Sequence, residues 1–134
     1  GPFRRSREGS DENPFLNYGY AVLRAIVARA ICAAGLHPCL GLHHHNQYGM
    51  FCLADDLMEP LRPIVDQVVH QITAHEDAPK KLDSHSKQAL LTPLLGRYQV
   101  NSEKLTLFEI SNKMAASLIK VFEGKARTLD LPEV

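Results

Sequence analysis

Apolar side chains recur every three or four residues through the first long hydrophobic stretch, which is the spacing of one face of an α-helix. Its apolar positions are Leu16, Tyr20, Leu23, Val27, Ala30, Ile31 and Ala34, with Phe15, Val22 and Ile26 widening the stripe. The polar residues 10–13 followed by Pro14 predict the helix start, and Gly35 predicts its end near residue 34. A helix this apolar is expected to be central. Gly19 within it predicts a close neighbour, because glycine costs about 1 kcal/mol relative to alanine in a helix.

A second helical pattern begins between Phe51 and Leu53 and continues to about Thr73. Its predicted core face comprises Leu57, Leu61, Ile64, Val65, Val68 and Ile72. The opposite face carries Asp55, Glu59, Arg62, Asp66 and His70, with Asp56 at the border. Pro60 and Pro63 lie inside the pattern and cannot donate backbone hydrogen bonds, so we expect a kink or a broken first turn.

The polar residues 75–84 are expected to form a surface loop. Asp83 or Ser84 is then predicted to cap a short helix, because both side chains can accept hydrogen bonds from the first turn. That helix continues through Leu95, and Pro93 interrupts it near its end.

The last third of the chain combines a turn signal with a further helix. Residues 96–104 are predicted to form a small hairpin with 101–103 in its turn. Thr106 and Glu109 have the spacing of a capping box that opens a last helix. Apolar positions of that helix are Phe108, Ile110, Met114, Ala115, Leu118, Ile119 and Phe122. The predicted fold class is all-α, with one short β-hairpin near 97–105.

Composition is that of one ordinary globular domain. The chain has 134 residues, of which 45% are hydrophobic and 22% charged, and its formal net charge is zero. Neutrality disfavours a protein that holds nucleic acid by bulk charge alone, but it allows a basic strip balanced by acids elsewhere. The longest apolar run, 21–36, is interrupted by Arg24 and Arg29, so we expect no contact with a membrane.

Cysteine usage suits a reducing cytoplasm. The three cysteines, Cys32, Cys39 and Cys52, are an odd number with neither disulfide nor zinc spacing. A zinc site built from Cys39, Cys52 and nearby histidines is a weak alternative, because neither cysteine has a close partner in sequence.

Three consecutive histidines, His43, His44 and His45, precede the acidic start of the second helix. Residues three or four apart share a helix face, so Glu59 can lie beside both Asp56 and Asp55. One interpretation is a solvated acidic face, partly neutralised by Arg62. The other is a site for Mg²⁺ or Mn²⁺, which favour carboxylate oxygens, completed by one imidazole from the preceding loop. Spacing alone favours the solvated face.

Two basic groups are candidates for contact with DNA phosphates. Arg4, Arg5 and Arg7 form one group, and Lys80 and Lys81 form the other. Side chains of this kind position nucleic acid through its phosphates, but such runs are also often only solvated. Both interpretations therefore stay open.

Beyond spacing, the order of motifs resembles a known family. Residues 17–24, NYGYAVLR, are similar to a helix of the CRISPR-associated integrases that insert new spacers, the first-numbered endonuclease of the adaptation module. Further similar segments are 35–38 (GLHP), 40–44 (LGLHH), 46–47 (NQ), 53–66 (LADDLMEPLRPIVD) and 117–131, which includes EGKARTLDLP. The resemblance covers the chain after its first two residues, and it is greatest to versions that accompany single-protein effector nucleases.

The resemblance implies a C-terminal, all-helical catalytic domain that the family joins to an N-terminal β domain. It also implies metal-dependent transesterification, in which the 3′-hydroxyl of a short DNA attacks a phosphodiester at the edge of the repeat array. The family's metal is held by an upstream glutamate, a histidine and a downstream acid. By motif, the histidine corresponds to His44 and the acid to Glu59, with Asp56 as a neighbouring helper and Mg²⁺ or Mn²⁺ as the ion. His43 and His45 are then expected to be surface or outer groups.

The chain departs from the family pattern at its start. The upstream glutamate should precede residues 17–24 by a few tens of residues, and Glu8, in an arginine-rich segment, does not take its role. We therefore expect residues 3–134 to be the C-terminal domain without the β domain and the upstream helix, and residues 1–2 to be an expression-tag scar. Implied partners are prespacer and repeat DNA, a second copy of the protein and a small ferredoxin-like subunit. The alternative function is a non-catalytic helical module that dimerises or docks partner subunits.

Overall fold

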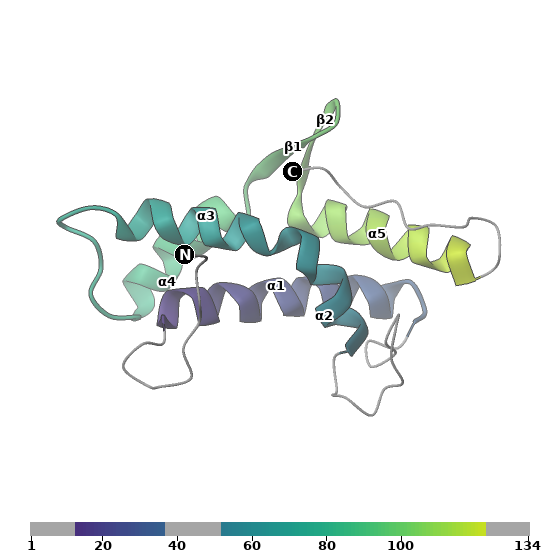
Figure 1. The fold of residues 1–134 in the computed structure, drawn as a ribbon, viewed down its shortest axis with the longest axis horizontal. Helices are drawn as coiled ribbons and strands as arrows, with labels where there is room; N and C mark the ends of the chain where they lie inside the picture. The colour runs from purple at the N-terminus through teal and green to yellow at the C-terminus, as the bar shows by residue number, and fades with distance from the viewer. Residues whose placement is uncertain (1–12, 37–51, 123–134) are drawn as a thin grey trace, which may run out of the picture.

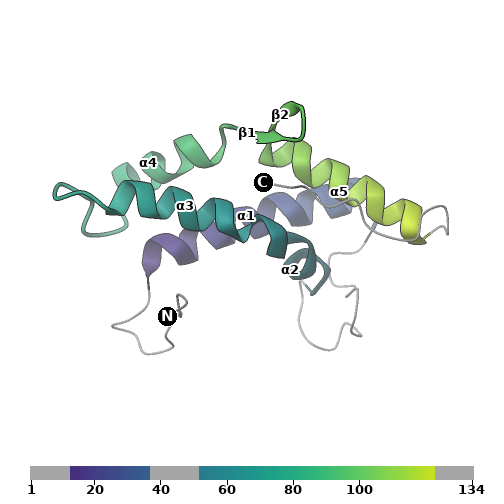
Figure 2. The same ribbon diagram turned by 45° about the horizontal axis from the view of Figure 1, so that its top comes forward.

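The computed structural model describes residues 13–36 and 52–122, which form helices and one β-hairpin (Figures 1 and 2). In chain order the elements are α1 (Pro14–Ala33), α2 (Cys52–Met58), the 3₁₀ turn η3 (Glu59–Leu61), α3 (Arg62–Thr73), α4 (Ser84–Leu94), β1 (Arg97–Val100), β2 (Glu103–Thr106) and α5 (Leu107–Phe122). The all-α fold class with one short hairpin is confirmed for these residues.

Helix α1 begins and ends at the residues that the sequence predicts. The backbone N–H groups of Phe15 and Leu16 donate to Asn13 Oδ1 at 2.9 and 3.1 Å, and Pro14 occupies the first helical position. Gly35 follows the helix with φ +88°, a left-handed conformation that other residues adopt at a cost. Local chemistry therefore sets both ends of the helix.

Helix α1 is also the centre of the fold, as its broad apolar surface predicts. It packs against α2, α3, α4 and α5. Figures 1 and 2 show α3 and α4 along the N-terminal half of α1, and α5 along its C-terminal half. By length and composition alone α1 could also cross a membrane, with a mean hydropathy of 1.2 over its most apolar window, but half of that window is buried in the fold. We interpret α1 as a core helix.

The contact between α1 and α3 is unusually close at one point. A Cβ atom added to Gly19 would lie 2.6 Å from Cγ1 of Val65, well inside the distance that two carbon atoms tolerate. Gly19 is buried, and Val65 is fully buried. The close neighbour predicted for Gly19 is therefore Val65.

The second predicted helix is broken into α2, η3 and α3, as its prolines indicate. Pro60 lies in the 3₁₀ turn and Pro63 in the first turn of α3. Neither can donate the hydrogen bond that would continue the helix from the preceding turn. Between the prolines Leu61 is completely buried, so the break is anchored in the core.

Helix α4 has a reciprocal N-terminal cap. Asp83 Oδ1 accepts from the Ser86 N–H at 2.9 Å, while the Asp83 N–H donates to Ser86 Oγ at 2.8 Å. Asp83 Oδ1 also accepts from Ser86 Oγ at 3.1 Å, and the backbone and side-chain hydrogen bonds that Ser86 donates to the carboxylate hold the pKa of Asp83 below its ordinary value. Of the two residues predicted to cap this helix, Asp83 is therefore the one that does so.

The hairpin and the start of α5 follow the predicted order with one correction. Strands β1 and β2 pair antiparallel, and Asn101 takes φ 56° in the turn. Glu103 pairs with Val100 and so belongs to β2, not to the turn as expected. At the next boundary, the Thr106 N–H donates to Glu109 Oε1 at 2.9 Å and the Glu109 N–H donates to Thr106 Oγ1 at 3.2 Å, which confirms the capping box.

Candidate functional site

The two candidate metal-binding acids lie on the broken segment between α2 and α3. Asp56 is in α2, where it is partly buried, and Glu59 is the first residue of η3, with a side chain that is 63% exposed. Buried neighbours of the same segment fix it to the core: Leu53, Ala54, Leu57, Met58 and Leu61. The apolar pattern therefore places the acids on the outer side of an anchored turn.

Glu59 is held by an arginine one turn later. Arg62 Nε donates to Glu59 Oε2 at 2.8 Å, and the Arg62 side chain is only 21% exposed. Its guanidinium lies 4.9 Å from the centre of the Tyr20 ring in α1, within the range of a cation–π contact. The interpretation that Arg62 partly neutralises the acidic face is confirmed for Glu59.

Tyr20 is fixed in turn from α3. Its hydroxyl donates a hydrogen bond to the carboxylate of Asp66, one turn beyond Arg62. Tyr20, Glu59, Arg62 and Asp66 thus form a continuous polar set that joins α1 to η3 and α3. We call this set the Tyr20 cluster. It limits the positions that the Glu59 carboxylate can take.

The sequence pattern does not predict Tyr20 and Asp66 as residues of the site. It predicts Tyr20 in the apolar stripe of its helix and Asp66 on the polar face opposite the core. The spacing of Arg62 and Asp66 places them on one helix face, but no sequence signal pairs either with Tyr20, more than forty residues earlier.

Asp55 has a different partner from its two acidic neighbours. Its Oδ1 accepts from Arg24 Nε at 2.9 Å, and both side chains are nearly half exposed. This pair ties α2 to α1 on the outside of the fold. The acids that the sequence motif assigns to the ion are its neighbours Asp56 and Glu59.

The donor chemistry fits a hard divalent cation in part. Asp56 and Glu59 supply carboxylate oxygens, the ligands that Mg²⁺ and Mn²⁺ favour. Within residues 13–36 and 52–122, no group of three potential metal ligands comes together. His43, His44 and His45 lie outside the described residues, so the direction of the His44 imidazole stays a prediction.

The remaining candidates are not drawn together by the described structure. Cys32 is a free and exposed cysteine of α1. The zinc alternative depends on Cys39, which lies outside the described residues, and on Cys52, whose side chain is not described. Arg4, Arg5, Arg7 and Glu8 also lie outside the described part of the chain.

Lys80 and Lys81 are exposed in the loop between α3 and α4, as predicted. The Lys81 carbonyl accepts from Ser86 Oγ at 2.9 Å, so the loop is fixed next to the α4 cap. This loop follows the C-terminal end of α3, whereas η3 precedes its N-terminal end, about 18 Å away along twelve helical residues. The two lysines therefore lie apart from the candidate acids.

The helical fold described above is similar to that of a solved protein of known class. A solved structure described as a casposase bound to integration product superposes with a TM-score of 0.73 and 26% sequence identity, covering 97% of this chain and 43% of that one. The family model described as CRISPR associated protein Cas1 matches residues 3–99, and the chain belongs to this family. The resemblance seen in the motifs is thereby confirmed.

Curated relatives agree with the family match. The CRISPR-associated endonuclease Cas1 of Neisseria meningitidis serogroup C (strain 8013) is 38% identical over 125 residues, which are 91% of this chain and 40% of the relative. The CRISPR-associated endonuclease Cas1 1 of Francisella tularensis subsp. novicida (strain U112) is 34% identical over 128 residues, 90% of this chain and 40% of the relative. The chain thus spans about 40% of the length of these relatives.

Proposed function

We propose that this chain is the part of a Cas1 endonuclease that supplies the metal-binding histidine and acid for inserting spacer DNA into CRISPR arrays. The observation that carries the proposal is the position of Glu59, which lies on an anchored turn and is held by Arg62 against Tyr20. Contacts of this kind, made to a metal ligand by the residues around it, fix the orientation of that ligand. Membership of the Cas1 family supports the assignment.

Glu59 and His44 would hold the ion, Mg²⁺ or Mn²⁺, with Asp56 as a helper. When bound, such an ion stabilises negative charge on the scissile phosphate and on the leaving oxygen, so no covalent enzyme intermediate is needed. In this proposal, Arg62 and Tyr20 hold Glu59 in position. Glu59 and the other ligands would have to keep the ion in one position for it to assist the transfer.

Substrates and partners follow from the family. The substrates are prespacer DNA with a 3′-hydroxyl and the edge of the repeat array, and the reaction is a transesterification. The related casposase was solved with an integration product, which supports DNA as the partner. The protein is proposed to work in the cytoplasm as a homodimer and with a small ferredoxin-like subunit.

One test replaces the acids in a chain extended to the full length of its relatives. Glu59→Ala is expected to abolish strand transfer of a 3′-hydroxyl oligonucleotide into branched DNA with Mn²⁺. Asp56→Ala should reduce the rate. Asp55→Asn is the matched control, because Asp55 is already paired with Arg24. Full activity in Glu59→Ala would show that another acid binds the ion.

The histidines can be separated in the same assay. His44→Ala is expected to abolish strand transfer, because it removes a direct ligand. His43→Ala and His45→Ala should lower it only about 10- to 100-fold or less, the effect of outer groups at metal sites. Equal loss at all three positions would mean that the wrong imidazole has been assigned.

The alternative, a non-catalytic helical module, applies to the 134 residues taken alone. Within the described ranges no group of three potential metal ligands comes together, and the family places a further ligand upstream. The chain alone is therefore expected to fold on its apolar core but to show no EDTA-sensitive cleavage or strand transfer. Cleavage that is lost in Glu59→Ala would show that the 134 residues complete the site themselves.

A further inference from the structure

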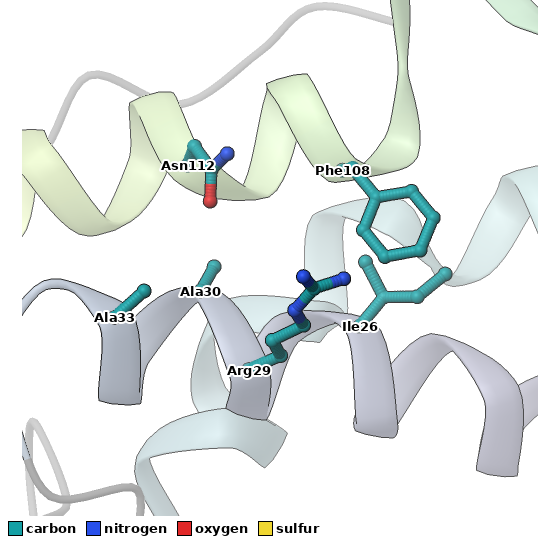
Figure 3. Close-up of a pocket in the computed structure, with 6 residues that line it drawn as sticks. All are labelled: Ile26, Arg29, Ala30, Ala33, Phe108 and Asn112. Atoms are coloured by element: carbon teal, nitrogen blue, oxygen red, sulfur yellow. The ribbon is translucent and has the colours of Figure 1, made fainter.

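A pocket of about 250 Å³ lies between the C-terminal half of α1 and the start of α5 (Figure 3). It is lined by Ile26, Arg29, Ala30, Ala33, Phe108 and Asn112. Sites for drug-sized ligands have volumes from about 300 Å³ upward, so this one has room for a single ring system. The small side chains of Ala30 and Ala33 leave the hollow open, because α5 does not fill the space above them.

Arg29 differs from the other arginines that the structure describes. Arg24, Arg62 and Arg97 each pair with a carboxylate, at 2.9, 2.8 and 3.2 Å. Arg29 has no carboxylate partner among the described residues. Its guanidinium instead lies 5.6 Å from the centre of the Phe108 ring, directed toward α5 (Figure 3). A guanidinium so placed can bind a phosphate bidentately without first giving up an ion pair.

Phe108 supplies an aromatic surface at the same place. It is 38% exposed, and Leu95, at 41%, is the other exposed large apolar side chain among the described residues. Figure 3 shows the ring at one edge of the pocket, with the Asn112 amide on the same helix one turn further on. An exposed ring beside a guanidinium and an amide is a combination that recognises nucleotides.

We propose that this pocket, the Phe108 pocket, binds one nucleotide of single-stranded DNA. The base stacks on Phe108, the Asn112 amide meets the base edge, and Arg29 binds the adjoining phosphate. A single strand fits because its bases are accessible, whereas in a duplex they are stacked and paired. The inference rests on the proposed function only in taking DNA as the ligand. It adds a contact that does not involve the candidate metal site.

The test measures binding of fluorescein-labelled oligothymidine to the 134-residue chain by fluorescence anisotropy. Phe108→Leu is expected to raise Kd at least about fivefold, since loss of one stacked base costs about 1–3 kcal/mol. Phe108→Trp should retain binding, because it retains the aromatic face. Arg29→Gln should weaken binding and lower the slope of log Kd against log salt by about 0.7, the value for one phosphate contact to a single strand.

Arg24→Gln and Leu95→Ala are the matched controls. The first removes a positive charge from the same helix but from an arginine already paired with Asp55, and the second removes an exposed apolar side chain elsewhere. Both should bind like the unsubstituted chain. Thermal melting verifies that each variant is folded, and Arg29→Gln keeps the test decisive if a Phe108 variant is not.

Three outcomes would overturn the proposal. If Arg29→Gln and Phe108→Leu bind oligothymidine as tightly as the controls, the Phe108 pocket is not a nucleotide site. The proposed function is not affected by that result. If Phe108→Leu binds oligothymidine as tightly as Phe108→Trp does, position 108 contributes apolar contact and not stacking on an aromatic ring. A chain that binds neither single-stranded nor branched DNA would count against DNA as its ligand altogether, whereas strand transfer by the extended protein tests the proposed function separately.

Discussion

Helix α1 is packed in two different ways along its length. In its N-terminal half, Gly19 allows Val65 of α3 to approach so closely that no Cβ would fit. In its C-terminal half, Ala30 and Ala33 face α5 across an open pocket. Small residues thus produce a closed contact at one end of the helix and a hollow at the other.

The residues of the neighbouring helix determine whether a small side chain in α1 gives a closed contact or a pocket. Val65 is β-branched and stiff, and it projects into the space that Gly19 leaves. Helix α5 presents Asn112 and the outward Phe108 instead, so the space above the alanines is not filled. A small side chain is therefore compatible with either arrangement, and only the facing residue distinguishes them.

The two halves are suited to different tasks. In the closed half, the Tyr20 cluster holds Glu59, the acid proposed to bind the metal, and such a ligand must be kept in one position. The open half presents an exposed ring and the guanidinium of Arg29, which forms no ion pair with any residue of 13–36 or 52–122. Under the two proposals, the candidate metal-binding acid lies beside the N-terminal half of α1 and the Phe108 pocket beside its C-terminal half.

The largest expected effect comes from filling the closed contact. Gly19→Leu should destabilise the chain by about 3 kcal/mol, because the added atoms meet a buried and stiff Val65. Gly19→Ala should cost less, about 1 kcal/mol, since alanine's better helix propensity offsets part of the clash. Urea denaturation measures both changes.

Val65→Ala supplies the control for this clash. In the Gly19→Ala background it should cost less than it does alone, since it also makes room for the new Cβ atom. If the losses of stability from Gly19→Ala and Val65→Ala simply add, the two positions do not clash. A Gly19→Ala variant that is more stable than the parent chain would likewise show that α1 and α3 can separate at little cost.

A smaller effect is expected from loosening the Tyr20 cluster. Arg62→Ala removes a cation–π contact and an ion pair whose acid is largely exposed, so stability should fall by about 1 kcal/mol. In the full-length protein it should also weaken Mn²⁺ binding about tenfold, through a less fixed Glu59. Isothermal titration measures this affinity.

The direction of the change in Mn²⁺ affinity distinguishes two roles for Arg62. Loss of a positive charge alone would strengthen cation binding, so weaker binding indicates a positioning role for Arg62. Arg62→Lys keeps the charge but not the planar stacking group, and it should restore the affinity only partly. Tighter Mn²⁺ binding in Arg62→Ala would show instead that Arg62 competes with the ion for Glu59.

The open contact should tolerate what the closed one does not. Ala33 is exposed, so Ala33→Leu should change stability by no more than about 0.5 kcal/mol, as for other surface positions. The added side chain should nevertheless occupy the Phe108 pocket and weaken oligothymidine binding. A destabilisation as large as that of Gly19→Leu would mean that the two halves of α1 do not differ in packing.

Elements with local signals could be predicted from the sequence. Asn13 and Gly35 mark the ends of α1, the prolines mark the break at η3, and Thr106 with Glu109 marks the start of α5. Each signal acts on the backbone within a few positions: a cap adds hydrogen bonds, a proline removes a donor, and Gly35 takes a positive φ. Such effects depend little on the rest of the fold, which is why these predictions are confirmed.

Long-range features could not be predicted in the same way. The apolar spacing of the last helix includes Phe108, yet the ring is partly exposed, because periodicity does not show how far a neighbouring helix covers a stripe. The contact of Tyr20 with Arg62 joins separate helices and has no sequence signature. The metal assignment to His44 came from the family resemblance, and it stays a prediction.

The smallest expected effect concerns the anchoring of α5, which forms the outer wall of the Phe108 pocket. Glu109 accepts from the Thr106 N–H and lies 3.2 Å from Arg97 Nη1, and the Thr106 hydrogen bond is the main cause that holds the pKa of Glu109 below its ordinary value. A lowered carboxyl pKa stabilises the fold above the unfolded-state pKa, and this contribution is lost as pH falls through the folded-state value.

Glu109→Gln should therefore melt slightly below the parent chain at pH 7, and the two melting temperatures should converge as pH falls below about 4, the range of an ordinary glutamate. Glu103→Gln is the control, because Glu103 forms an exposed ion pair with Lys113 and has no part in the cap. Oligothymidine binding at pH 7 should weaken slightly in Glu109→Gln if the cap holds the pocket wall in place. A Glu109→Gln variant that stays less stable by the same amount at low pH would show that the side chain acts through its shape and not through its charge.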